Sequence, residues 1–141
     1  DINKGLTTAH AFIDQGADVI LPVACQVGEG AARAALDSGT ASIIWVDSDG
    51  YDTLSPDFRP VLLTSVLKNT GSAVVEIVKT SIDDTFDNAP FIGTLENGGV
   101  GIAPFHDLAP RVSAELSAEI DQLRSDIVAG TIVVTSPSTP R

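Results

Sequence analysis

The chain has 141 residues, which fits one compact domain because domains commonly have about 100–200 residues. Hydrophobic residues make up 43% of it and the mean hydropathy is +0.22, so the chain can bury a core and is not a disordered tail. Its formal net charge of −11 argues against nucleic acid or an anionic membrane as partner, since both need a basic face. The single cysteine cannot form an internal disulfide, and the sequence contains no zinc-binding pattern.

The first part of the chain alternates helical and strand patterns. Glycine follows each helical pattern, as is common after the last residue of a helix. Helix and strand follow one another at short distances, which is the βαβ rhythm of a parallel sheet and predicts an α/β fold. The expected elements are a helix over residues 7–15, a short buried strand over 19–23, a helix over 31–38 and a strand over 42–46.

A continuous apolar run ends abruptly at Asp47, Ser48, Asp49 and Gly50. Such a run predicts a strand that is buried on both faces and carries acids at its carboxyl end. Ligands of open α/β sheets bind at that end. A second predicted strand ends at Lys68. We therefore expect Asp47 and Lys68 to reach one crevice and hold a polar small molecule by hydrogen bonds.

The rest of the chain contains weaker signals. Asn97-Gly98 lies between two apolar runs, and Asn-Gly is the strongest short signal for a β-hairpin. Ser113 can cap a helix with a regular apolar stripe, which Gly130 ends. The expected elements are a loop over residues 51–60, a strand over 61–67, an amphipathic helix over 70–81, a polar loop over 83–90, hairpin strands over 91–95 and 100–103, a helix over 113–129, a strand over 131–134 and a tail over 136–141.

The acids at the end of the first strand have several interpretations. A phosphatase-type Asp-x-Asp motif would want Thr or Val where this chain has Tyr51. A calcium loop would want an oxygen ligand and a glycine where the chain has Tyr51 and Asp52. The acids could bind the hydroxyls or amines of a ligand, or they could simply cap a turn with Gly50. The residues alone leave the last two interpretations open.

The glycine-punctuated turn over residues 24–30 could present backbone N–H groups to an anion, or could be only a tight connection from strand to helix. It matches no phosphate-binding motif. Cys25 fits a buried small thiol better than a nucleophile. Lys68 could be a ligand donor, a catalytic amine or a surface lysine. The residues show no activated nucleophile, metal cluster or cofactor motif, so we predict a non-catalytic binding lobe without a cofactor or metal.

Four segments together resemble the basic membrane protein family, which comprises lipoprotein substrate-binding proteins of ABC transporters with the type 1 periplasmic-binding fold. The resemblance covers nearly the whole chain. The segments occur in the family's order and approximate spacing: residues 14–20 (Asp-Gln-Gly-Ala-Asp-Val-Ile), 46–49 (Val-Asp-Ser-Asp), 64–69 (Thr-Ser-Val-Leu-Lys-Asn) and 96–104 (Glu-Asn-Gly-Gly-Val-Gly-Ile-Ala-Pro).

The resemblance implies a nucleoside bound between two lobes, with its ribose held by an aspartate and a lysine. Asp47 matches the first acid of the family's Val-Asp-x-Asp motif, and Lys68 matches the lysine of its Ser-Val-x-Lys-Asn motif. The family's glycine-rich turn also lines the cleft. Here Cys25 replaces its first glycine and Gln26 follows. We therefore expect Asp47, Lys68, Cys25, Gln26 and Asp49 to bind the ligand.

The resemblance also implies that residues 1–141 form the C-terminal part of a two-lobe domain, with strands that cross the hinge and a first lobe that is absent from this sequence. The expected partners are a nucleoside and an ABC permease in the membrane. The parent protein would lie outside the cytoplasm, attached to the cell membrane through a lipid anchor in its N-terminal part. Two alternatives are a ligand-sensing regulator of the same fold and a small hydrolase that uses Asp47 and Asp49.

Overall fold

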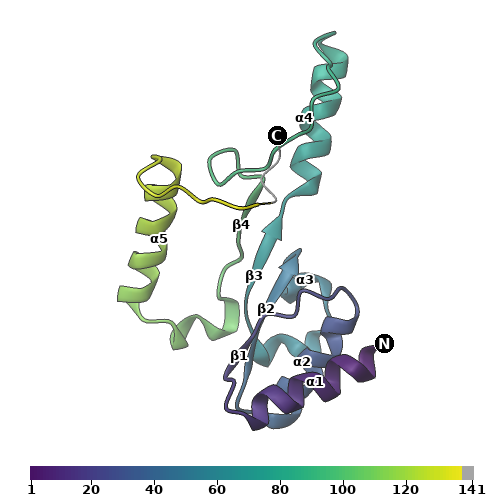
Figure 1. The fold of residues 1–141 in the computed structure, drawn as a ribbon, viewed down its shortest axis with the longest axis vertical. Coiled ribbons are helices and arrows are strands. Elements are labelled where there is room, and N and C mark those ends of the chain that lie inside the picture. Colours follow the sequence, from purple (N-terminus) through teal and green to yellow (C-terminus); the bar gives the residue numbers. More distant parts are fainter. Residues whose placement is uncertain (138–141) are drawn as a thin grey trace. The chain divides into compact units, whose positions relative to one another are not determined.

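The computed structural model describes residues 1–137, which divide into two compact units (Figure 1). Unit 1 comprises Asp1–Leu67 and Ile102–Val112, and unit 2 comprises Lys68–Gly101 and the chain from Ser113 onward. The elements in chain order are α1 (Ile2–Asp14), β1 (Val19–Ile20), α2 (Val27–Ser38), β2 (Ser42–Asp47), α3 (Gly50–Thr53), the 3₁₀ helix η1 (Pro56–Val61), β3 (Leu62–Lys68), α4 (Thr70–Ile82), β4 (Val100–Ile102), the 3₁₀ helix η2 (His106–Arg111) and α5 (Ala114–Val128).

Within residues 1–137 the strands form one four-stranded sheet of order β1-β2-β3-β4. β2 pairs in parallel with β1 and with β3, which confirms the predicted parallel α/β sheet. β1 is shorter than expected because Pro22 lacks an N–H group and the chain turns there, with the Ala24 N–H donating to the Pro22 carbonyl at 2.9 Å. The chain leaves this strand in a tight turn that leads into α2.

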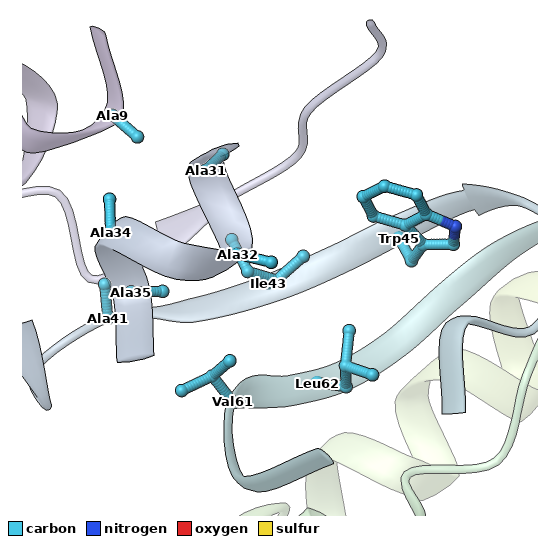
Figure 2. Close-up of a cluster of buried hydrophobic side chains, with 10 residues drawn as sticks. All are labelled: Ala9, Ala31, Ala32, Ala34, Ala35, Ala41, Ile43, Trp45, Val61 and Leu62. Carbon is cyan, nitrogen blue, oxygen red and sulfur yellow. The ribbon is translucent and has the colours of Figure 1, made fainter. Parts of the chain in front are cut away.

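The core of unit 1 lies between the sheet and its helices (Figure 2). Ile43 and Trp45 on one face of β2 are buried, and so are Ser42 and Val46 on the other face, as predicted for a strand covered on both faces. The alanines of α2 are buried as well, and α1 packs along this helix. Small residues allow this close packing: a Cβ atom on Gly30 would collide with the backbone of α1, at the Ile2 carbonyl oxygen. The α1–α2 contact therefore depends on glycine at residue 30.

Unit 2 contains the two longer helices of the second half of the chain. Both confirm the predictions, and the Ser113 hydroxyl caps α5 by accepting the Leu116 N–H at 3.1 Å. In the part of the chain that the structure describes, neither α4 nor α5 contains a buried residue. The apolar side chains of α4 are instead exposed, among them Val74, Val78 and Ile82.

The predicted hairpin is wrong, because residues 91–95 do not form a strand. A turn stabilised by the Asn97 side chain takes its place. The carboxamide oxygen accepts the N–H groups of Thr94 at 2.8 Å and Gly99 at 2.9 Å, and the amide donates to the Ile92 carbonyl at 3.0 Å. These bonds satisfy backbone groups that a strand ladder would otherwise pair. Only the segment after the turn, β4, joins the sheet.

Other boundaries also differ from the predictions. Residues 131–134 form bends and irregular structure instead of a strand, and Val133 is exposed. Residues 51–60 contain α3 and most of η1 instead of a loop. α1 begins at Ile2 instead of residue 7, because Asp1 caps it by accepting the Asn3 N–H at 3.0 Å. The last residues of the predicted tail, 138–141, lie outside the described residues.

Candidate ligand-binding site

Asp47 ends β2, with an exposed side chain and a φ of +69°. This left-handed conformation is uncommon for residues other than glycine, although aspartate tolerates it better than most. Immediately after it, the Ser48 N–H donates to the Val46 carbonyl at 2.9 Å. The strand therefore ends in a sharp corner, which we call the β2 corner (Asp47–Gly50).

The register of the sheet relates the two predicted ligand residues. Asp47 is paired with Leu67 of the parallel strand β3, and Leu67 directly precedes Lys68. The last residue of β2, Asp47, and the last residue of β3, Lys68, are therefore one register position apart, as expected for the ends of two parallel strands. Lys68 is exposed and is the first residue of unit 2.

Asp49 caps the short helix α3, so the interpretation in which an acid caps a turn is confirmed for this residue. One carboxylate oxygen, Oδ1, accepts the Tyr51 N–H at 3.0 Å. The neighbouring Gly50 N–H donates to the Ser65 hydroxyl on β3 at 3.0 Å, and Ser65 is 1% exposed. A Cβ atom on Gly50 would lie only 2.9 Å from Cβ of Trp45. The corner is thus fixed to the core on one side and to α3 on the other.

His106, from the segment after β4, reaches the same corner. Its Nε2 lies 2.8 Å from Oδ2 of Asp49, and the two side chains are only 22% and 20% exposed. Its ring stacks on Tyr51, with 4.1 Å between ring centroids and an interplanar angle of 13°. The guanidinium carbon of Arg59 lies 4.4 Å from the centroid of the same tyrosine ring. The side chains of Asp49, Tyr51, Arg59 and His106 thus lie together, with Asp107 next to them in the chain.

The Tyr51 hydroxyl donates to the Asp107 carboxylate, with both oxygens at 3.1 Å. This hydrogen bond is the main cause of a raised pKa for Tyr51, because ionisation would remove the donor proton and place two negative charges together. Desolvation and the charge of Asp107 raise the pKa further, and the charge of Arg59 lowers it. No sequence motif points to His106, because it stands 57 positions away from Asp49 in the chain.

Cys25 and Gln26 lie in the turn between β1 and α2. Cys25 is exposed, so the prediction of a buried thiol is wrong, and its φ of +48° shows the sharpness of the turn. The first N–H groups of α2 donate to carbonyls of this turn, from Val27 to Ala24 at 3.1 Å and from Gly28 to Cys25 at 2.9 Å. These bonds use N–H groups that an anion would need, which favours the interpretation as a tight connection.

The turn borders an open hollow of about 550 Å³, which is lined by Asp1, Ile2, Asn3, Ala24, Cys25, Gln26 and Val27. Unit 1 therefore places two of the predicted ligand residues beside this hollow and two others, Asp47 and Asp49, in the β2 corner. Within residues 1–137 no group of three or more His, Cys, Asp and Glu side chains is arranged to hold a metal ion. Over the same residues, no helix is long and apolar enough to cross a membrane.

Residues 1–138 match the family described as ABC transporter substrate-binding protein PnrA-like, or Bmp. The chain belongs to the Bmp family. The resemblance noted in the sequence is therefore confirmed over almost the entire chain.

Solved structures show the same fold. An ABC transporter solute-binding protein from Aeropyrum pernix K1 is 20% identical over 98% of this chain, with a TM-score of 0.79. A solute-binding protein of the same kind from Conexibacter woesei DSM 14684 is 20% identical over 96% of the chain, with a TM-score of 0.73. A transcriptional activator of the comK gene from Bacillus halodurans is 18% identical over 96%, with a TM-score of 0.77. The Bmp chain spans only 43–45% of the length of these proteins.

Proposed function

We propose that this chain forms one part of a two-lobe substrate-binding protein of an ABC transporter, and that the complete protein binds a nucleoside between its lobes. The match to the Bmp family over residues 1–138 carries this proposal. Two further observations support it. The chain spans less than half of the solute-binding proteins that share its fold. It also passes between units 1 and 2 three times, after Leu67, after Gly101 and after Val112, as expected of a hinged domain.

Asp47 is proposed to accept hydrogen bonds from the ribose hydroxyls, and Lys68 to donate to the sugar. Both side chains are exposed, and both residues stand at the carboxyl ends of parallel strands, where ligands of open α/β sheets bind. A carboxylate and an ammonium are suited to a polyol because one accepts and the other donates charge-assisted hydrogen bonds. Cys25 and Gln26 are proposed to line the cleft beside the ligand. Asp49 is proposed to act on the ligand through the conformation of the β2 corner.

The proposed role is non-catalytic. Binding would close the two lobes by a hinge motion, and the closed protein would deliver its ligand to a membrane permease. Substrate-binding proteins of the Bmp family are extracytoplasmic. We propose the same location for this protein, with attachment to the membrane through a lipid anchor on the complete polypeptide.

Calorimetric titration with a panel of nucleosides tests the proposal, using the complete polypeptide that carries this sequence. Asp47→Ala and Lys68→Ala should each weaken binding about tenfold or more, because each removes a hydrogen bond to a charged group. Asp57→Ala and Lys79→Ala are matched controls, since they remove an exposed acid and an exposed lysine elsewhere. Affinity that is unchanged in both test variants would reject the proposal.

A regulatory role is the second candidate, because the fold is shared with a protein described as a transcriptional activator. In that case the nucleoside would still bind, but the closed form would contact a signalling partner instead of a permease. The neighbouring genes distinguish the two. Permease and ATPase genes beside this one favour transport, and a fused DNA-binding segment favours regulation.

A further inference from the structure

We propose that the Asp49–His106 pair is a positioning device that holds Asp47 in its left-handed conformation and so sets the affinity for the ligand. This inference rests on the proposed function, because it assigns His106 an indirect role in the same site. His106 does not need to touch the ligand. It would act through Asp49 and the β2 corner.

The conformation of Asp47 requires support. Its φ of +69° brings the Cβ atom of an L-residue close to the following carbonyl oxygen, which is unfavourable. Residues in such conformations persist where the surrounding structure fixes them. The hydrogen bond from the Ser48 N–H to the Val46 carbonyl is local, and Asp49, within the same corner, adds contacts to residues outside it.

Asp49 supplies these contacts from two residues further along the chain. Its Oδ1 accepts the Tyr51 N–H at 3.0 Å and lies 3.5 Å from the Ser65 hydroxyl, and its Oδ2 faces His106 at 2.8 Å. Both carboxylate oxygens are thus engaged inside unit 1. This is why Asp49 is better suited to positioning than to binding a ligand directly.

His106 is itself held in place by neighbouring groups. It has a φ of +42°, and its ring stacks on Tyr51, whose hydroxyl is bound to Asp107 on the same segment. The Arg59 Nε donates to the Tyr51 carbonyl at 3.2 Å, which adds a contact from η1. The segment that follows β4 therefore contacts the β2 corner through His106, and contacts Tyr51 just beyond the corner through Asp107. The His106–Asp49 contact is partly buried, and both contacts involve a carboxylate, so the loss of either should loosen the structure around it.

The test uses His106→Phe, which keeps a flat ring for stacking on Tyr51 but removes the nitrogen that faces Asp49. His106→Gln is the rescue variant, because its amide can still donate to a carboxylate. Three quantities are measured on the complete polypeptide: the backbone chemical shifts of Asp47, the hydrogen exchange rate of the Tyr51 amide, and the affinity for the nucleoside that binds best in a panel. The Ala34 amide, in the buried part of α2, reports global unfolding.

In His106→Phe we expect changed Asp47 shifts, about tenfold faster exchange at Tyr51 and about tenfold weaker nucleoside binding, with Ala34 unchanged. In His106→Gln, the chemical shifts, the exchange rate and the affinity should all return most of the way to their wild-type values. Unchanged Asp47 chemical shifts together with unchanged Tyr51 amide exchange would overturn the inference. It would also be overturned if exchange at Ala34 became faster by the same factor as exchange at Tyr51 in both variants, since the whole unit would then be unfolding. Intact nucleoside affinity in His106→Phe would also overturn it. Asp47→Ala and Lys68→Ala, measured in parallel, separate the two proposals: if both variants bind normally, the proposed function itself fails.

Discussion

Gly30→Ala tests how unit 1 is packed, because a methyl group at this position would enter the backbone of α1. The added Cβ would collide with the Ile2 carbonyl oxygen and with the Leu6 backbone nitrogen. Backbone atoms cannot rotate away as a flexible side chain could, so the two helices must move apart. α1 and α2 would then lose part of the packing around Ala9 and Ala31, which are buried in the core.

The expected effect combines two opposing terms. Overpacking costs about 1–3 kcal/mol, and a clash with backbone lies at the upper end of that range. Alanine is favoured over glycine in a helix by about 1 kcal/mol. We therefore expect Gly30→Ala to lower the free energy of unfolding of unit 1 by about 2 kcal/mol. With a urea m-value of about 1–3 kcal/mol/M, the midpoint should fall by about 1 M.

Trp45 provides the assay, since it is the single tryptophan of the sequence and is only 7% exposed in the core of unit 1. Its fluorescence during urea unfolding reports this unit. Gly71→Ala in α4 is the matched control, because no atom beyond its chain neighbours and the backbone of its own helix lies within 4 Å of the added methyl group. That control should leave the Trp45 midpoint unchanged. A Gly30→Ala midpoint equal to that of the wild type, or an equal fall in the control, would refute the packing argument.

Three further predictions concern other parts of the chain. Asp107→Ala should lower the pKa of Tyr51 towards its ordinary value of 10.0, measured by ultraviolet titration of this single tyrosine; an unchanged midpoint would show that Asp107 is not the cause. Because the folded-state pKa is raised, the stabilisation is present below pH 10 and is lost as the pH rises through the folded-state value, so the wild type should lose its stability advantage over Asp107→Ala at alkaline pH. Asp47→Gly should be about 1 kcal/mol more stable than Asp47→Ala in urea unfolding, since only glycine adopts a positive φ without strain, and equal stabilities would contradict the left-handed corner. Ser113→Ala should destabilise α5 by about 1 kcal/mol, with reduced helicity in circular dichroism, whereas Ser113→Asp should keep the cap and the helicity.

The sequence predicted the elements whose causes are local. The apolar run before Asp47 fixed a buried strand, and the left-handed Gly39 ended α2 where expected. Ser113 was recognised as a cap because its partner, Leu116, is three residues away. The family could also be inferred, since its motifs are short and lie in a regular order.

Features that depend on distant residues could not be predicted. His106 meets Asp49 only because the sheet returns the chain to the β2 corner, and no local pattern encodes that meeting. The close approach of α1 and α2 at Gly30 is likewise a property of the packed structure. For residues 131–134 the sequence predicted a strand that does not form. Their β-branched composition favours a strand, but strand formation also depends on packing against a neighbouring strand.

The central claim is that Asp47 holds the ribose of a nucleoside. The most direct measurement compares the nucleoside that binds best with its 2′,3′-dideoxy analogue, using calorimetry on the wild type and on Asp47→Ala. The wild type should bind the nucleoside with the intact ribose about tenfold or more tightly than the dideoxy analogue. Asp47→Ala should bind the two ligands almost equally, because it lacks the carboxylate that accepts hydrogen bonds from the hydroxyls. The same preference in both proteins, or no binding of any nucleoside by the wild type, would contradict the claim.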